Sequence, residues 1–264
     1  RNEINDNTFS YSLGAGGVAT GSINVITINI NQLIQRKLDL HSVVERVHKY
    51  QVAYRKLIEQ YFSEETPSAS PRILKAPDYT PRQQKKQLSV VQSHTTLGGV
   101  APDLHSDERT AMGLLINVLG GPSLNNKLSL NIREKYGFAY FLESNYILYS
   151  DAGLFEVYFN TEPKQQERCE ALVRAEMAKF CKKPMTETAL KAAKKQLKGQ
   201  VVMGYDNAGA VGQYLARQLL NFDQVRTYEK DMQLIDQITT QDVYALANQY
   251  FNPSELRRMV SEPK

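Results

Sequence analysis

Residues 119–140 have the sequence LGGPSLNNKLSLNIREKYGFAY, in which glycines separate a turn, a helix and a strand. Gly120 and Gly121 stop the preceding helix and, with the proline and serine that follow them, make a tight turn into the next helix. Gly137 ends that second helix, and a strand is predicted directly after it. The stretch therefore predicts two helices that are joined by a tight turn and lead into a β-sheet.

The chain around this stretch continues the mixed pattern. Strands followed by several consecutive helices are typical of α+β proteins, in which helices cover one face of a sheet. We therefore predict an α+β fold with a mostly antiparallel sheet and helices packed on one face. Strands are predicted over 87–97, 138–147, 153–160 and 256–260, and helices near 106–119, 123–135, 163–181, 186–201, 210–221, 226–237 and 240–250.

The residues before this part differ in composition. Residues 22–31 alternate as a β-strand does, and residues 33–62 have the apolar spacing of a long helix. The prolines at positions 67, 71, 77 and 81 predict a linker, because proline cannot donate a backbone hydrogen bond. We therefore predict three parts: a strand and long-helix segment of uncertain origin over 1–65, a linker over 66–85 and the principal domain over 86–264.

The composition is that of an ordinary globular protein. Of the 264 residues, 42% are hydrophobic and 23% are charged, which excludes disordered and collagen-like chains. The 32 Lys and Arg against 28 Asp and Glu are too small an excess to indicate a nucleic-acid partner. No apolar run approaches the roughly 18 residues that cross a bilayer, so no membrane partner is predicted and cytoplasmic placement is the default expectation. Because the chain opens with Arg1 and not with Met, we expect a fragment, a processed product or a trimmed chain.

Candidate metal ligands are few. Cys169 and Cys181 lie twelve positions apart on one predicted helix, too far for a disulfide or a shared zinc ion. His41, Glu45 and His48 fall at helical positions i, i+4 and i+7, so this helix face either approaches a metal or is simply solvated. A helical zinc peptidase needs His-Glu-x-x-His or the inverted His-x-x-Glu-His, and this spacing is neither. We therefore predict no metal ligand in this chain.

Arg133 and Tyr140 are the candidate binding residues of the opening stretch. Arg133 lies near the end of the predicted helix, and Tyr140 lies just beyond Gly137 at the start of the next strand. A guanidinium and a phenol can both donate hydrogen bonds to a carbonyl oxygen. The alternative is that Arg133 caps the carbonyl groups of its own helix and that Tyr140 is half-buried packing in the sheet. The residues by themselves leave both interpretations open.

Several segments together carry a family resemblance. They are LGGPSLNNKL at 119–128, IREKYGFAY at 132–140, SDAGLFEVYFNTEP at 150–163 and MTETALKAAKKQLKGQ at 185–200. In this order and spacing, residues 62–264 resemble the C-terminal, zinc-free half of the pitrilysin / insulin-degrading enzyme / mitochondrial processing peptidase family of zinc metallopeptidases. Residues 10–62 resemble, more weakly, a segment of anaerobic ribonucleotide reductases, but they lack the cysteine pair and glycyl-radical segment of those enzymes, so no activity is transferred from them.

The family resemblance implies a function for the stretch. Members of this family pair two α+β halves around a closed chamber, and the N-terminal half holds zinc through His-x-x-Glu-His and a distal Glu. The zinc-free half grips the peptide, with an Arg and a Tyr separated by six residues near the scissile bond. Arg133 and Tyr140 match that pair, and the turn at Gly120 and Gly121 would orient it.

The departure from the family pattern concerns the metal. No His-x-x-Glu-His occurs in the 264 residues, so the chain alone is predicted to be inactive. The resemblance then implies the substrate-binding, non-catalytic half of a zinc metalloendopeptidase that acts on peptides or unfolded polypeptides. Zinc is expected in a missing or partner half, encoded by the same gene or supplied by another subunit. The alternative is a catalytically inactive relative that serves as a scaffold or partner subunit.

Overall fold

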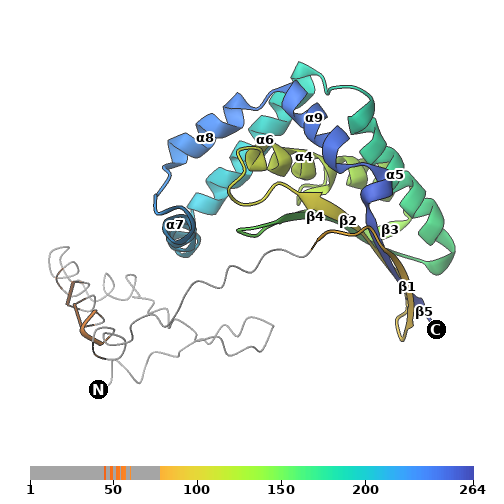
Figure 1. Ribbon diagram of the computed structural model, residues 1–264, viewed down its shortest axis with the longest axis horizontal. Helices are drawn as coiled ribbons and strands as arrows, with labels where there is room; N and C mark the ends of the chain where they lie inside the picture. Colours follow the sequence, from red (N-terminus) through yellow and green to blue (C-terminus); the bar gives the residue numbers. More distant parts are fainter. Residues whose placement is uncertain (1–44, 46–47, 50–51, 54, 58–59, 61–77) are drawn as a thin grey trace. The chain divides into compact units, whose positions relative to one another are not determined.

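A computed structural model describes residues 45, 48–49, 52–53, 55–57, 60 and 78–264 (Figure 1). The chain divides into two units, Arg1–Arg72 and Ile73–Lys264. The described residues of the first unit are helical and fall within the helix predicted over 33–62. The strand predicted over 22–31 and the linker residues up to position 77 lie outside the described residues.

One sheet forms the base of the second unit. Its strands follow the order β1–β5–β2–β4–β3, in which β1 pairs in parallel with β5 and the other neighbours pair antiparallel. The prediction of a mostly antiparallel sheet is therefore confirmed. The strands are β1 Gln83–Leu88, β2 Ser93–Ala101, β3 Ala139–Leu148, β4 Gly153–Thr161 and β5 Arg257–Pro263.

Helices lie over one face of this sheet, as Figure 1 shows for α4, α5, α6 and α9. This arrangement confirms the predicted α+β class. The α-helices are α4 Arg109–Gly120, α5 Gln166–Lys182, α6 Glu187–Tyr205, α7 Ala208–Phe222, α8 Tyr228–Gln237 and α9 Thr240–Tyr250. Three shorter helices complete this unit: the π-helix η1 Ser129–Glu134 and the 3-10 helices η2 Pro163–Gln165 and η3 Pro253–Glu255.

The alternation of side chains along the strands explains why the helices lie on one face. On β4, Phe155, Val157 and Phe159 are almost completely buried, whereas Glu156 and Tyr158 between them are only half-buried. The buried set packs with residues of α4, α5 and α9 in the principal core. We call the opposite side, which carries Glu156 and Tyr158, the open face of the sheet.

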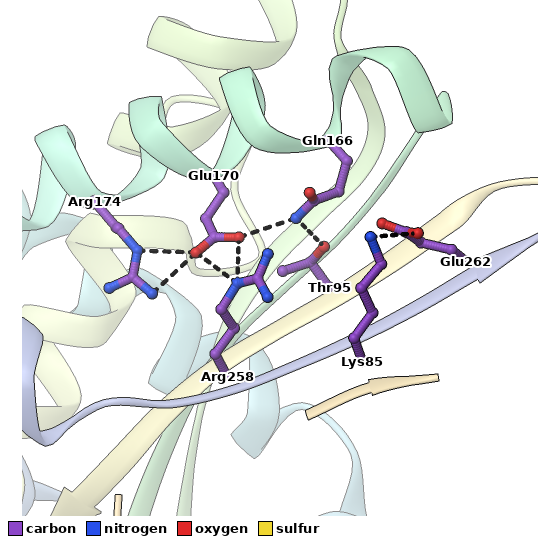
Figure 2. A network of polar contacts seen from close by, with 7 residues as sticks. All are labelled: Lys85, Thr95, Gln166, Glu170, Arg174, Arg258 and Glu262. Atoms are coloured by element: carbon purple, nitrogen blue, oxygen red, sulfur yellow. Dashed lines mark hydrogen bonds and ion pairs between the residues drawn. The ribbon is translucent and has the colours of Figure 1, made fainter. Parts of the chain in front are cut away.

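A buried ionic network fastens α5 to the sheet (Figure 2). The Glu170 carboxylate accepts hydrogen bonds from Arg258 Nε on β5 (2.8 and 2.9 Å), from Arg174 Nε (3.0 Å) and from Gln166 Nε2 (2.9 Å). Gln166 also donates to Thr95 Oγ1 on β2 (3.1 Å). Burial alone would raise the pKa of Glu170, but the hydrogen bonds from Arg258, Arg174 and Gln166 outweigh it and hold that pKa below its ordinary value.

One predicted strand has different bounds in the structure. The segment predicted as a single strand over 87–97 belongs to two strands, and β1 begins at Gln83, within the residues predicted as linker. The partner of β1 is the C-terminal strand β5, and Lys85 and Glu262 form an ion pair across the two strands (2.7 Å; Figure 2). Because this partner lies so far along the chain, no local pattern indicated that β1 would form.

Candidate functional site

The turn after α4 is held by the side chain of Asn126. This buried amide donates to the carbonyl oxygens of Gly121 and Ser123 (both 2.7 Å), and its Oδ1 accepts from the backbone N–H of Ser129 (2.7 Å). A helix was predicted from residue 123, but these hydrogen bonds hold the residues before 127 in a turn. The helix therefore begins later, at residue 127. Sequence reasoning missed Asn126, although asparagine after a Gly-Pro-Ser turn is a known signal for side-chain bonding to the backbone.

The same turn is tied to α6 through side-chain amides. Asn117 Nδ2 donates to Gln200 Oε1 (2.6 Å), and Gln200 Nε2 donates to Ser123 Oγ (3.1 Å). One helical turn earlier on α6, Gln196 Oε1 accepts from Asn125 Nδ2 (2.9 Å). The segment 185–200 therefore positions the turn through Gln196 and Gln200.

Arg133 lies in the last turn of the π-helix η1. Its Nε and one terminal nitrogen donate to Glu134 Oε1 (3.1 and 2.9 Å), and its side chain is 32% exposed. The alternative that Arg133 caps its own helix carbonyls is therefore not what the structure shows. A π-helix is rare and often marks a functional site, because its wider turn changes the direction in which side chains project.

Gly137 separates Arg133 from the next strand. It has a φ of +66°, in the left-handed region, and its N–H donates to the carbonyl oxygen of Arg133 (2.9 Å). A Cβ atom at this position would contact nothing within 4 Å, so glycine is favoured here by backbone conformation and not by space. Gly137 thus ends the helix and sets the direction in which β3 begins.

Replacing Gly137 by alanine should lower the free energy of unfolding by about 1 kcal/mol, because an L side chain disfavours the left-handed conformation. Gly137→Asn is the matched control and should lower the free energy of unfolding by less, since asparagine tolerates the left-handed backbone conformation. Urea unfolding of the full chain measures both values. Equal losses for Ala and Asn would show that conformation is not the cause.

Tyr140 is strongly exposed at the start of β3. Its exposed fraction is 86%, whereas Ala139 before it and Leu142 after it are almost completely buried. The pairing register between β3 and β4 shifts between Ala139 and Leu142, and such a bulge allows the two intervening residues, Tyr140 and Phe141, to project outward together. The alternative that Tyr140 is half-buried sheet packing is therefore wrong.

The open face beside Tyr140 carries further aromatic and polar groups. Phe141 packs edge-on against Tyr158 of β4, with ring centroids 5.7 Å apart, and the Tyr158 hydroxyl is hydrogen-bonded to His94 Nδ1 of β2 (2.6 Å). Burial and the nearby Glu143 carboxylate raise the pKa of Tyr158. His94 therefore belongs to this group. The alternation along 153–160 was the signal that placed Tyr158 on this face.

The predicted binding residues therefore share one segment but have different surroundings. Gly120 and Gly121 are buried in the turn, where they support the backbone. Arg133 and Tyr140 both reach solvent on either side of Gly137, and no hydrogen bond joins these two described side chains. Their donors can therefore be used by a bound molecule.

The described residues do not fit a zinc ion. Among them no three His, Cys, Asp or Glu side chains form a group that could hold a metal. Glu45 and His48 are described and exposed, but His41 lies outside the described residues, so the helix face that they share stays a prediction. In the part of the chain that the structure describes, no helix is both long and apolar enough to cross a membrane.

Comparison with known proteins identifies relatives of this chain. Residues 52–197 match the family model described as the Peptidase M16 inactive domain. An uncharacterized zinc protease of Mycobacterium leprae is 30% identical over 161 residues, which are 61% of this chain and 36% of that protein. The chain therefore spans well under half of this relative.

Solved structures share the fold. The peptidase M16 inactive domain from Pseudomonas fluorescens aligns with a TM-score of 0.65 at 23% identity, over 74% of this chain and 47% of that one. A protease from Helicobacter pylori aligns with a TM-score of 0.70 at 18% identity, over 86% of this chain and 53% of that one. At such identities the likeness concerns the fold.

Proposed function

Because the chain belongs to peptidase family M16 and carries its inactive domain, we propose that it is the substrate-binding, non-catalytic half of a zinc metalloendopeptidase. The relatives that it matches are named zinc proteases, and this chain corresponds to only part of their length. The metal and its chemistry would come from a zinc-bearing half, encoded by the same gene or supplied by a partner subunit. The contribution of this chain would be to hold the peptide.

The observation that supports this proposal most directly is the exposure of Tyr140. A tyrosine that is 86% exposed contributes little apolar burial to the fold, yet it lies with Phe141 in a bulge between the buried residues Ala139 and Leu142, on an edge strand of the sheet. Exposed aromatic side chains on rigid elements are typical of binding sites. The phenol is therefore available to a ligand without loss of packing.

Arg133 can act on the same ligand. Glu134 engages Nε and one terminal nitrogen of its guanidinium, which leaves further N–H donors for another acceptor. A peptide lying extended along the open face would present carbonyl oxygens to this guanidinium and to the Tyr140 hydroxyl. Donors that are held by a rigid turn stabilise a carbonyl oxygen, and more strongly an oxyanion, at little reorganisation cost.

Arg133→Ala and Tyr140→Phe should each lower kcat/KM for a quenched fluorescent peptide by about tenfold in the enzyme reconstituted with the zinc-bearing half. Both side chains are partly or fully exposed, so the melting temperature should not change. Tyr244→Phe, on α9 and outside the open face, is the matched control and should retain full activity. Wild-type kcat/KM in both site variants would remove the assignment.

A second function is favoured by a specific observation, the lack of His-x-x-Glu-His in the 264 residues. A relative without its own metal motif could serve as a scaffold that only supports a partner subunit. Mixing this chain with a candidate zinc-bearing half distinguishes the two. A stable complex whose peptide turnover equals that of the zinc-bearing half alone favours the scaffold, whereas increased turnover favours the substrate-binding half.

A further inference from the structure

A cavity of about 940 Å³ lies among α4, α6, α7, α8 and the end of β3. This volume is within the range of small-molecule sites. Its lining comes from these helices, the end of β3 and the adjoining loops, and includes neither Arg133 nor Tyr140. Most of the lining is apolar, and six of these residues are Leu104, Leu148, Leu197, Val201, Leu234 and Ile235.

Positive charge gathers at one part of this lining. The guanidinium carbons of Arg109 and Arg226 lie 5.0 and 5.1 Å from the centre of the same ring, that of Phe222, and Arg217 also lines the cavity. Within residues 78–264 none of these three arginines forms an ion pair with a carboxylate. The acidic residue of the lining, Asp231, instead accepts a hydrogen bond from Tyr214. The cavity therefore favours an anion.

A buried polar atom of the lining lacks a partner. The Gln218 side-chain carbonyl oxygen makes no hydrogen bond to any described residue, whereas the Tyr205 hydroxyl interacts with Tyr214 and Asp231. A buried acceptor that is left unpaired is unfavourable, so a ligand that donates a hydrogen bond to Gln218 would gain affinity. The N–H of a secondary amide is such a donor.

We propose that this cavity binds a carboxylate that carries an apolar body and one secondary amide. Such a ligand is either an N-acyl amino acid or the C-terminal end of a short apolar peptide. Its carboxylate pairs with Arg109 and Arg226, its amide N–H donates to the side-chain oxygen of Gln218, and its hydrocarbon fills the apolar remainder. A longer peptide fits less well, because each added residue would bury an N–H and a C=O in a lining that is mostly apolar.

Calorimetric titration of the full chain tests this proposal with N-dodecanoylglycine and the dipeptide Leu-Leu, each of which has one secondary amide, as probes. At least one of these acids should bind, with an affinity about tenfold or more above that of its C-terminal carboxamide, and the better of the two identifies the source of the ligand. Dodecanoic acid, which has no amide, should bind more weakly than N-dodecanoylglycine. Absence of binding by both acids at about 1 mM, or equal affinity for acid and carboxamide, would overturn the proposal.

Variants locate the site. Arg109→Gln combined with Arg226→Gln should weaken the binding of the acid by about tenfold or more. Gln218→Leu should weaken the binding of N-dodecanoylglycine but not the binding of dodecanoic acid. The matched control is Arg257→Gln, since Arg257 lies 4.9 Å over the Tyr79 ring and does not line the cavity. An equal loss in Arg257→Gln would show that only net charge matters and would refute the site.

A measurement on the wild-type chain keeps the test independent of variant folding. Methyl NMR spectra should show that N-dodecanoylglycine shifts the signals of Leu234 and Ile235, which line the cavity. The methyl signals of Val260 on β5 should remain unchanged. Shifts at Val260 without shifts at Leu234 and Ile235 would place the ligand elsewhere and overturn the proposal.

Discussion

Replacing Glu170 by glutamine is expected to lower the free energy of unfolding by about 3 kcal/mol at neutral pH. The side chain is only 10% exposed, and its carboxylate accepts from Arg258, Arg174 and Gln166 together. Glutamine keeps the volume but offers one acceptor oxygen, so Arg258, 20% exposed, loses its anionic partner while it stays partly buried. Removing one member of such a pair costs more than the pair itself contributes.

The control for this prediction is Glu262→Gln, which breaks the pair with Lys85. The Lys85 side chain is 58% exposed, so water replaces the lost partner and the expected change is below about 1 kcal/mol. Chemical unfolding of both variants and the wild type measures the difference. Similar losses at the two positions would contradict the view that burial determines the cost.

The effect of Glu170 should also depend on pH. The pKa of this carboxyl is lower in the folded chain than its ordinary value, so its stabilising contribution is present above that ordinary value. The contribution is lost as the pH falls through the folded pKa, because the carboxylate must then be protonated. The stabilities of wild type and Glu170→Gln should therefore converge at acid pH. A difference that stays constant from neutral to acid pH would show that the charge of Glu170 is not the cause.

The elements that the sequence predicted well are those with local signals. The strand predicted over 153–160 is β4, because apolar and polar residues alternate strictly along it. The helix predicted over 240–250 is α9, which begins with a capping box formed by Thr239 and Asp242. Each of these signals depends on residues within one or two turns of the chain, so they can be found without knowledge of the fold.

The features that escaped prediction depend on distant or three-dimensional contacts. β1 forms because β5 pairs with it, and the bulge that exposes Tyr140 arises from the register with β4. The helix predicted over 123–135 begins later because Asn126 makes three hydrogen bonds that hold the turn before it. The spacing of apolar residues also did not predict that the centre of this helix is a π-helix. The family resemblance suggested Arg133 and Tyr140 as candidate binding residues, whereas only the structure shows how far each is exposed.

Gly120→Ala is expected to lower the free energy of unfolding by about 2–3 kcal/mol, because overpacking a core without free space forces the backbone to shift. A Cβ atom at Gly120 would lie 2.8 Å from Leu128 Cδ1, 2.8 Å from Ser144 Oγ and 2.9 Å from Ser144 N. The last of these is backbone and cannot rotate away. Moving Ser144 would also break the hydrogen bond from its hydroxyl to the Ile116 carbonyl oxygen (2.8 Å).

The same helix provides a matched control with the opposite sign. A Cβ atom at Gly113, also in α4, would contact nothing within 4 Å. Gly113→Ala should therefore raise the free energy of unfolding by about 0.5–1 kcal/mol, because alanine favours the helix. Urea unfolding of both variants separates close packing from helix propensity. If both alanines stabilise the chain, the turn after α4 has room to relax, and the rigid support proposed for Arg133 and Tyr140 would lose its physical basis.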